Sequence, residues 1–361
     1  MDPVLNLFDT YVLQAIVEEI VATPTFFKDR YFPTEDGDIF AADKVLAEYK
    51  RGDRKMAPIV SPRAGDIPMD RMGYEVSEYQ PAFIAPSRVL TMDDLKKRGF
   101  GEALYANSTP AQRAARLILQ DQTDLDKAIR RREEWMCAET MVNNACTMQE
   151  YLDDTTKGQK LYVKFFNGSS DHIFTTSKKW DAANITYMDV RSDVRAMCKE
   201  LTHRSLPAVD LVMGVDVADA LLAIKELREL LDKNSGISVG SIMEELSAYE
   251  GVSFMGRLNF GGYNLNLISV DETYVDDSGN DTPYFPATAV MVTAPRCGRL
   301  KYGQITQIDY GSSDPATHTG IRIPKLVVDQ DKDIRKLRLG ARPLAVPSNY
   351  CPYIVATGVV G

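Results

Sequence analysis

Long apolar runs are missing from this sequence. No run reaches the roughly 18 apolar residues that a membrane-spanning helix needs. The N-terminal stretch carries Asp2, Asp9, Glu18 and Glu19 in place of the basic start and uninterrupted apolar core of a secretory signal. We therefore expect a protein that stays in the cytoplasm where it is made.

Cysteine and histidine are scarce, and neither occurs in a reactive pattern. The five cysteines contain no C-x-x-C pair and are odd in number, so we predict reduced, mostly buried thiols and no zinc site. The three histidines, His172, His203 and His318, lie far apart, and no H-E-x-x-H or G-x-S-x-G motif occurs. We therefore predict no catalytic, cofactor-binding or metal-binding residues.

Basic residues are outnumbered by acidic ones. The 42 Lys and Arg against 51 Asp and Glu give a net charge of −9. Strong electrostatic binding of nucleic acid requires a basic surface, so this balance argues against a DNA-binding module. It is compatible with a container for DNA, because a shell that adhered to its genome would hinder release.

Two motifs that superficially suggest ligand sites are better explained as turns. Residues 251–256 have the glycine spacing of a phosphate-binding loop, but Arg257 and Leu258 replace the expected Lys-Ser/Thr. The acidic turn at 276–281 lacks the alternating ligands and final glutamate of a calcium-binding loop. We predict a turn before a strand at the first, and a hairpin tip between Val275 and Tyr284 at the second.

The N-terminal quarter of the chain has little to bury. Residues 3–27 predict a short amphipathic helix, ended at Thr23-Pro24 and followed by an extended strand. From Asp36 to Thr91, glycine and proline recur without a continuous apolar face. This segment is either a disordered loop or an extended β-arm ordered by another surface. A hairpin with about 18 residues per strand would reach about 60 Å.

A very long helix should follow. Asn107, Ser108 or Thr109 can cap it, Pro110 suits its first turn, and neither glycine nor proline interrupts the chain from Ala111 to about Asp153. Its apolar stripe contains Ile118, Leu125, Ile129 and Met136. Such a helix measures about 65 Å, against about 50 Å for a compact sphere of this chain. We therefore predict an elongated or flat molecule.

An α/β pattern completes the chain. We expect a hairpin of strands 160–166 and 172–176, and a terminal pair of strands at 335–344 and 353–356. Between them, helices are predicted at 192–203 and 217–231, and strands at 208–213, 254–260, 264–270, 289–292 and 301–308.

Two charged clusters are candidate contacts with other subunits. Lys50, Arg51, Arg54 and Lys55 begin the extended arm and either remain solvated or pair with acidic residues of a neighbour. Arg130, Arg131 and Arg132, followed by Glu133 and Glu134, form a charged face of the helix that is either solvated or meets a neighbour's arm. The full candidate set is Lys50, Arg51, Arg54, Lys55, Arg71, Tyr74, Tyr79, Arg130, Arg131 and Arg132.

The order of these parts resembles the Hong Kong 97-type fold of tailed-phage major capsid proteins. Met56–Pro62, Asp70–Tyr74 and Tyr79–Pro86 are similar to the extended loop of the lambda-type branch, the major capsid protein E family. Other similar stretches are Tyr249–Val252, Tyr284–Pro286 and Leu300–Ile305 in the central domain and Arg342–Pro347 in the closing strands. The resemblance runs from about residue 30 to the end.

This resemblance implies an α+β capsid fold with five parts. They are an N-terminal arm at 1–35, an extended loop at 36–92, a peripheral domain at 93–188 with a spine helix at about 109–153, an axial domain at 189–324, and return strands of the peripheral domain at 325–361. It also implies a structural protein and not an enzyme. Its copies would form the hexamers and pentamers of an icosahedral head around double-stranded DNA.

Partners follow from the same resemblance. Because the chain begins almost directly with its arm, a separate scaffolding protein is implied, together with a portal and a cementing protein at three-fold positions. Assembly would occur in the host cytoplasm and the product would be the virion. Three other functions stay open: a gene-transfer particle or cargo nanocompartment of the same fold, another phage structural protein such as a tail or portal component, and an α/β enzyme with an unrecognised site.

Overall fold

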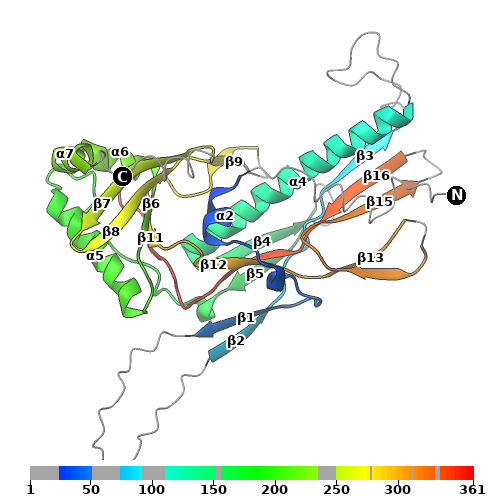
Figure 1. Ribbon diagram of the computed structural model, residues 1–361, viewed down its shortest axis with the longest axis horizontal. Coiled ribbons are helices and arrows are strands. Elements are labelled where there is room, and N and C mark those ends of the chain that lie inside the picture. Colours follow the sequence, from blue (N-terminus) through cyan, green and yellow to red (C-terminus); the bar gives the residue numbers. More distant parts are fainter. Residues whose placement is uncertain are drawn as a thin grey trace, which may run out of the picture.

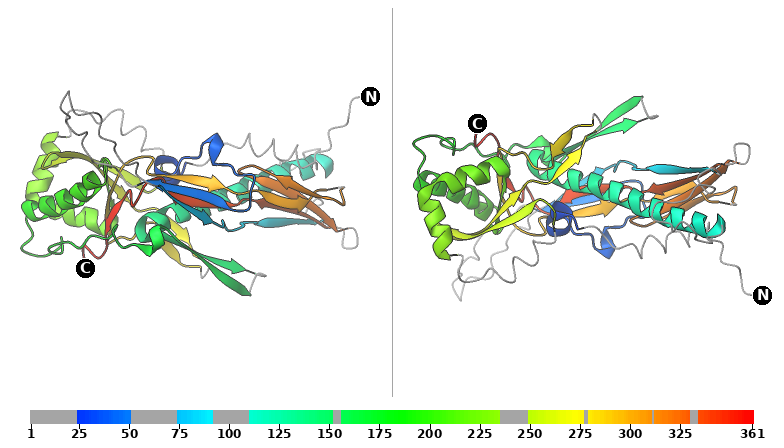
Figure 2. Two further views of the ribbon diagram at one scale, coloured as in Figure 1. Left: turned by 90° about the horizontal axis from the view of Figure 1, so that it is seen from below. Right: turned by 90° about the horizontal axis from the view of Figure 1, so that it is seen from above.

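The computed structural model describes residues 24–50, 74–91, 110–151, 156–234, 249–276, 279–310, 312–329 and 334–361. They form an elongated α+β molecule, with a helix-covered sheet at one end and a long helix running toward the other (Figure 1). Two further views show the same long outline, with one hairpin, β4–β5, leaving the body (Figure 2). The predicted elongation is confirmed.

Helix α4, Pro110–Asn143, is the long element. Its 34 residues make it about 51 Å long. The predicted stripe is buried: Ile118, Leu125 and Ile129 pack against a three-stranded sheet, and Met136 enters the main core. Burial of one apolar face is what stabilises a helix of this length.

The end of α4 differs from the prediction, because the helix stops at Asn143 and not near Asp153. Asn144 takes a left-handed backbone conformation with φ of 52°, and the chain continues as a strand. Asparagine tolerates this conformation better than most residues and can end a helix where glycine is absent. The Asn144 side chain is held by the Tyr353 hydroxyl, which donates to its Oδ1 at 2.9 Å.

Short antiparallel sheets surround α4. The three-stranded sheet has the order β15 (Ile323–Asp329), β16 (Ile334–Gly340), β3 (Ser87–Thr91). The two-stranded pairs are β1 (Val45–Lys50) with β2 (Tyr74–Tyr79), β4 (Ala145–Tyr151) with β5 (Lys157–Lys164), β9 (Thr273–Val275) with β10 (Asp281–Pro283), β12 (Gly298–Tyr302) with β17 (Pro343–Pro347), and β13 (Ile305–Ile308) with β14 (Pro315–His318). The hairpin predicted between Val275 and Tyr284 is confirmed by β9 and β10.

A five-stranded sheet forms the other end of the molecule. Its order is β18 (Ile354–Ala356), β11 (Val290–Thr293), β6 (Asp210–Gly214), β8 (Tyr263–Val270), β7 (Val252–Phe260), with only β6 and β8 parallel among these pairs. Helices α5 (Tyr187–His203), α6 (Val215–Ala223) and α7 (Lys225–Asn234) pack against it. The single helix predicted at 217–231 is therefore two, separated by Ile224 in an extended conformation. The break lets Leu221 and Leu227 both reach the core of this end.

Several predicted pairings are wrong. Strand β5 pairs with the preceding β4, while Phe166–Gly168 form a turn of 3-10 helix and Ile173 makes a single parallel bridge to Val355. The terminal strands do not pair with each other, since β16 joins β15 and β18 joins the five-stranded sheet. The segment 189–324, predicted as the axial domain, contains β9, β10, β12, β13 and β14, which lie outside the five-stranded sheet, and omits β18.

The first described residues contain a helix where an extended strand was expected. Helix α2, Phe26–Tyr31, follows Pro24 and buries Phe26, Phe27 and Tyr31 in the main core. Most of the amphipathic helix predicted at 3–27 lies outside the residues that the structure describes. All five cysteines are buried and unpaired, as predicted. Within the described ranges, no helix combines the length and hydropathy required to cross a bilayer.

Candidate functional site

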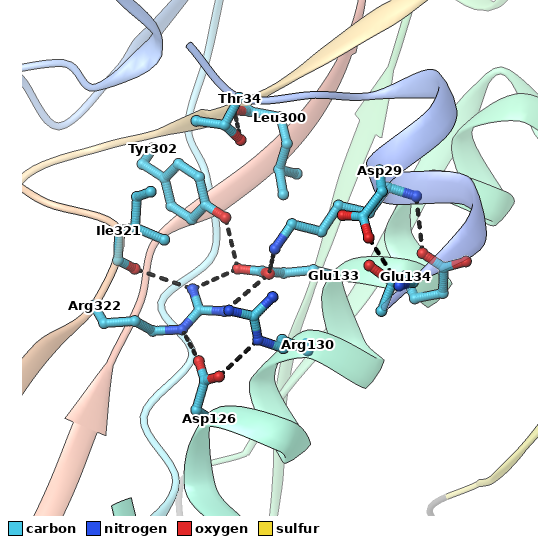
Figure 3. Close-up of polar contacts among 12 residues, drawn as sticks. Asp29, Thr34, Asp126, Arg130, Glu133, Glu134, Leu300, Tyr302, Ile321 and Arg322 are labelled. Atoms are coloured by element: carbon cyan, nitrogen blue, oxygen red, sulfur yellow. Dashed lines mark hydrogen bonds and ion pairs between the residues drawn. The ribbon is translucent and has the colours of Figure 1, made fainter. Parts of the chain in front are cut away.

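The most concentrated group of charged side chains is buried on α4. Arg322, just before β15, donates from Nη1 and Nη2 to the two oxygens of Glu133 at 2.7 and 2.9 Å, and from Nε to Asp126 Oδ1 at 2.7 Å (Figure 3). The Arg322 side chain is 5% exposed and that of Glu133 is 0% exposed. A bidentate pair this deeply buried is costly to break, because removing one partner leaves an uncompensated charge.

Three further groups complete this cluster. Lys28 Nζ on α2 donates to Glu133 at 2.7 Å, the Tyr302 hydroxyl on β12 donates to Glu133 at 2.9 Å, and Arg130 Nε donates to Asp126 at 2.6 Å. Burial alone would raise the pKa of Glu133, but the positive charges and hydrogen bonds of Arg322 and Lys28 together lower it to about 2. The cluster therefore joins four segments that are distant in the sequence.

The neighbouring Glu134 holds α2 by its backbone. Its two carboxylate oxygens accept the N–H groups of Phe27 and Lys28 at 2.5 and 2.8 Å (Figure 3). Burial raises the pKa of Glu134 to about 8, although these two hydrogen bonds oppose the rise. The first-turn N–H groups of a helix have no acceptor within the helix, and the Glu134 carboxylate is the acceptor for two of them here.

The other end of α2 is attached to the five-stranded sheet. Arg30 donates from Nε and Nη2 to Asp210 at 2.8 and 2.9 Å, and the Tyr31 hydroxyl donates to the same carboxylate at 3.1 Å. Asn266 on β8 adds a fourth hydrogen bond, 2.8 Å long. Helix α2 thus connects α4 to β6 through buried carboxylates at both ends. The arrangement is suited to fixing the relative position of the two ends of the molecule.

The charged residues predicted to form one face of the helix separate into two environments. Arg130 belongs to the buried cluster, whereas Arg131 and Arg132 line a groove of about 480 Å³ between α4 and the β9–β10 hairpin. The Arg132 guanidinium lies 5.3 Å from the centre of the Trp135 ring. The expectation of one charged face through Glu134 is wrong, because Glu133 and Glu134 point into the core.

Of the candidate contact residues in the predicted arm, the structure describes Lys50, Tyr74 and Tyr79. Lys50 and Tyr74 are directly paired at the end of the β1–β2 ladder. Tyr79 packs edge-on against Phe165, with ring centres 5.1 Å apart, so it contacts its own chain. Arg51, Arg54, Lys55 and Arg71 lie outside the described residues.

The buried charges were missed by the sequence reasoning, although one signal was present. Glu133 lies four residues after Ile129 and three before Met136, which places it on the apolar stripe of α4. A carboxylate on such a stripe requires a buried cation. The sequence did not indicate which one, since Arg322 is 189 residues away.

Comparison with known proteins assigns the family. The family described as phage major capsid protein E matches residues 9–357. The chain belongs to the phage major capsid protein E family. This family consists of structural phage capsid proteins, so the protein is a component of the virion and not an enzyme. The predicted identity is confirmed.

Relatives of this capsid protein are distant in sequence. It is 23% identical over 285 residues to the P21 prophage-derived major head protein of Escherichia coli and to the major capsid protein of Enterobacteria phage P21, covering 78% of this chain and 79% of each relative.

No cluster of three or more metal-ligating side chains is found in the parts of the chain described above.

Solved structures show that the fold is shared. The putative capsid protein of an Escherichia coli CFT073 prophage aligns with a TM-score of 0.68 at 19% identity, covering 97% of this chain and 98% of the other. A phage-related protein from Bordetella bronchiseptica aligns with a TM-score of 0.52 at 9% identity, covering 97% of both chains. The α+β capsid fold is therefore established for this chain.

Proposed function

We propose that this capsid protein self-assembles into hexamers and pentamers that close an icosahedral head shell around double-stranded DNA. Identical copies cooperate through many modest contacts, so no single interface has to be strong. The excess of acidic side chains suits enclosure of DNA without sequence-specific binding. Its assembly would take place in the host cytoplasm.

The observation that carries this proposal is the β1–β2 ladder. The ladder is part of neither the five-stranded nor the three-stranded sheet, and it lies at the margin of the molecule (Figure 1). Val45 and Ala47 anchor it in the main core, whereas Leu46 and Val76 are 40% and 50% exposed. A two-stranded ribbon is only marginally stable by itself in water. An adjacent subunit that covers it would supply the missing packing.

The proposed division of the chain follows the observed packing. The extended loop remains 36–92 and the spine helix is α4. The axial domain is proposed to be the five-stranded sheet with α5, α6 and α7, drawn from 187–293 and 354–360, and the strands between 298 and 347 join the peripheral domain. Lys50, Arg51, Arg54, Lys55, Arg71 and Tyr74 are proposed to contact the adjacent subunit, the cations through its acidic residues. Arg131 and Arg132, which border an open groove, are proposed as a separate intersubunit contact.

Three kinds of partner are proposed for assembly. A separate scaffolding protein would guide curvature, a portal would occupy one vertex, and a cementing protein would bind at three-fold positions. These partners rest on the family resemblance. The β4–β5 hairpin leaves the body, and the 56% exposed Tyr162 on it supports the proposal of a further binding surface (Figure 2).

A loop-shortening variant tests the proposal. Lys50 and Tyr74 face each other directly, so residues 51–73 can be replaced by Asn-Gly, which forms the tight turn that a two-residue hairpin connection requires. The variant should fold, with an unfolding temperature close to that of the unmodified chain. It should form no closed particles under conditions where the unmodified chain does, as judged by electron microscopy.

Two results would contradict the proposal. Closed particles built from the shortened chain would show that the loop is not needed for assembly. An unmodified chain that stays monomeric with and without its scaffolding protein would remove self-assembly altogether. The nucleic acid recovered from purified particles distinguishes a DNA head from a cargo compartment.

A further inference from the structure

The outer face of the three-stranded sheet is unusually rich in positive charge. Leu337 and Leu339 of β16 point toward α4, so the alternate residues Lys336 and Arg338 point away from it. In the antiparallel register, Lys325 of β15 lies directly opposite Arg338. Two cations therefore face each other across neighbouring strands, with a third two residues away.

This arrangement is unfavourable for the isolated chain. Like charges directly opposite each other in an antiparallel pair are destabilising. Burial and the nearby charge of Arg338 lower the pKa of Lys325, and burial lowers the pKa of Arg338. Arg338 Nε is buried without a hydrogen-bond partner among the described residues, while Nη2 donates to Gln307.

Nearby carboxylates neutralise these cations only in part: the charge of Asp309 raises the pKa of Lys325, against the larger opposing effects of burial and Arg338. Asp309 accepts hydrogen bonds from Gln307 Nε2 and His318 Nε2 at 3.0 and 2.7 Å. Asp329 lies at the far end of β15, opposite Ile334 and away from the Lys325–Arg338 pair. The centre of the face therefore keeps an excess of positive charge that a carboxylate from elsewhere would relieve.

Exposed apolar side chains lie among the cations. Val89 is 50% exposed, Val327 is 42% exposed, and Phe83, over whose ring Arg338 lies at 5.4 Å, is 45% exposed. Val89 and Val327 both pair in register with Lys336. A nucleic-acid backbone offers charge but no complement for these apolar groups, whereas an acidic protein surface with an exposed apolar residue offers both.

The chain itself contains such a surface in the β9–β10 hairpin. Residues 271–283 include five acidic residues and no lysine or arginine. Val275, at the end of β9, is 66% exposed. Asp281 is exposed directly opposite it, and Asp271 is exposed just before β9. We propose that this hairpin of one copy docks on the outer face of the β15–β16–β3 sheet of a second copy, with its carboxylates on Lys325, Lys336 and Arg338.

The two surfaces belong to different copies because of their places in the fold. The hairpin borders α4 beside Ala128 and Arg132, whereas the cationic face is the side of the sheet turned away from α4 (Figure 1). A contact between two different patches is heterologous and can repeat from copy to copy, as rings and shells require. The inference rests on the proposed self-assembly and specifies one of its contacts.

A charge-swap series tests the contact. Lys325→Glu/Lys336→Glu and Asp271→Lys/Asp281→Lys should each lower the yield of closed particles at least tenfold. All four changes in one chain should restore particles, because the ion pairs are regenerated with reversed sign. Lys325→Arg/Lys336→Arg, which keeps the charge, should leave the yield unchanged. Lys325→Glu alone should also raise the unfolding temperature of unassembled chain, because it replaces a repulsion with an attraction to Arg338.

Two outcomes of this series overturn the proposal. If the acidic hairpin variant assembles normally while the cationic variant does not, another acidic partner uses the face. If the four-fold variant folds but stays unassembled, the two surfaces do not meet. If the unmodified chain forms no particles, the proposed function fails. Carbodiimide crosslinking of the concentrated chain then tests separately whether the hairpin of one copy contacts the cationic face of another. Absence of crosslinks from Lys325 or Lys336 to Asp271 or Asp281 of another copy would then refute it.

Discussion

Replacing Arg322 with methionine should destabilise the unassembled capsid protein more than any comparable surface change. The substitution removes four hydrogen bonds, three of them to carboxylates, and leaves Asp126 and Glu133 facing apolar surroundings, with Lys28, Arg130 and Tyr302 as their remaining partners. Breaking a buried ion pair in this way costs about 3–5 kcal/mol. That is a large part of the roughly 5–15 kcal/mol that stabilises an ordinary domain.

The pH dependence gives this prediction its sign. The pKa of Glu133 in the folded protein is about 2, against an ordinary glutamate value of 4.5. A lowered folded pKa contributes stability above the unfolded pKa, here about 3 kcal/mol, which is lost as the pH falls from about 4.5 toward 2. Without Arg322 the pKa of Glu133 rises, so the cost of Arg322→Met should be largest at pH 7 and smaller at pH 5.

Urea unfolding followed by circular dichroism measures the effect. Arg322→Met/Glu133→Gln should lose at least about 1 kcal/mol less than the sum of the two single variants, because the charge stranded by the first change is removed by the second. Arg88→Met is a matched control: Arg88 is 47% exposed beside Asp121 and Asp124, and such pairs contribute about 1 kcal/mol or less. A cost below 1 kcal/mol for Arg322→Met, or equal costs at pH 5 and 7, would refute the reasoning.

Three further predictions concern the attachment of α2 and the sheet at the other end. Glu134→Gln should flatten the loss of stability between about pH 4.5 and 8, because a folded pKa raised to about 8 favours the protonated folded state below that value; unchanged slopes in pH-dependent unfolding would contradict this. Asp210→Asn should lower the free energy of unfolding by about 2–3 kcal/mol and speed tryptic cleavage after Arg30, because Arg30 loses the carboxylate that it binds. Cleavage at the original rate would show that this ion pair does not hold α2 to the sheet. Gly214→Ala should cost about 1–3 kcal/mol in thermal unfolding, since its Cβ would overlap the backbone oxygens of Pro286 and Ala287; an unchanged unfolding temperature would show that this contact relaxes freely.

The main helix could be predicted because its signals are local. A long stretch without glycine or proline and the stripe through Ile118, Leu125 and Ile129 are properties of α4 alone. Its end could not, because Asn144 is fixed in its left-handed conformation by tertiary contacts with Phe165 and Tyr353. The partner of β5 could not be predicted either. The turn-forming Asn167-Gly168 predicted pairing with the following segment, whereas β5 pairs with the preceding β4.

For each buried ion pair of the candidate site, the sequence could indicate only one of the two partners. Glu133 stands on an apolar stripe and so demands a cation, but Arg322 and Lys28 reach it from opposite parts of the chain. Asp210 is similarly bound by Arg30, 180 residues earlier. Sequence periodicity reports which side of an element is buried, whereas partners that distant depend on topology.

The position of β18 has a consequence for the timing of folding. Ile354–Ala356 form the edge of a sheet whose other strands lie between 210 and 293, and the following Val359 is fully buried in the same core. A chain interrupted before residue 354 therefore lacks the strand that closes this sheet over β11. Incomplete products of translation or proteolysis would expose β11 as the sheet edge and lack the core side chains Ile354, Ala356 and Val359, so this end of the molecule can complete its packing only after the last residues are made.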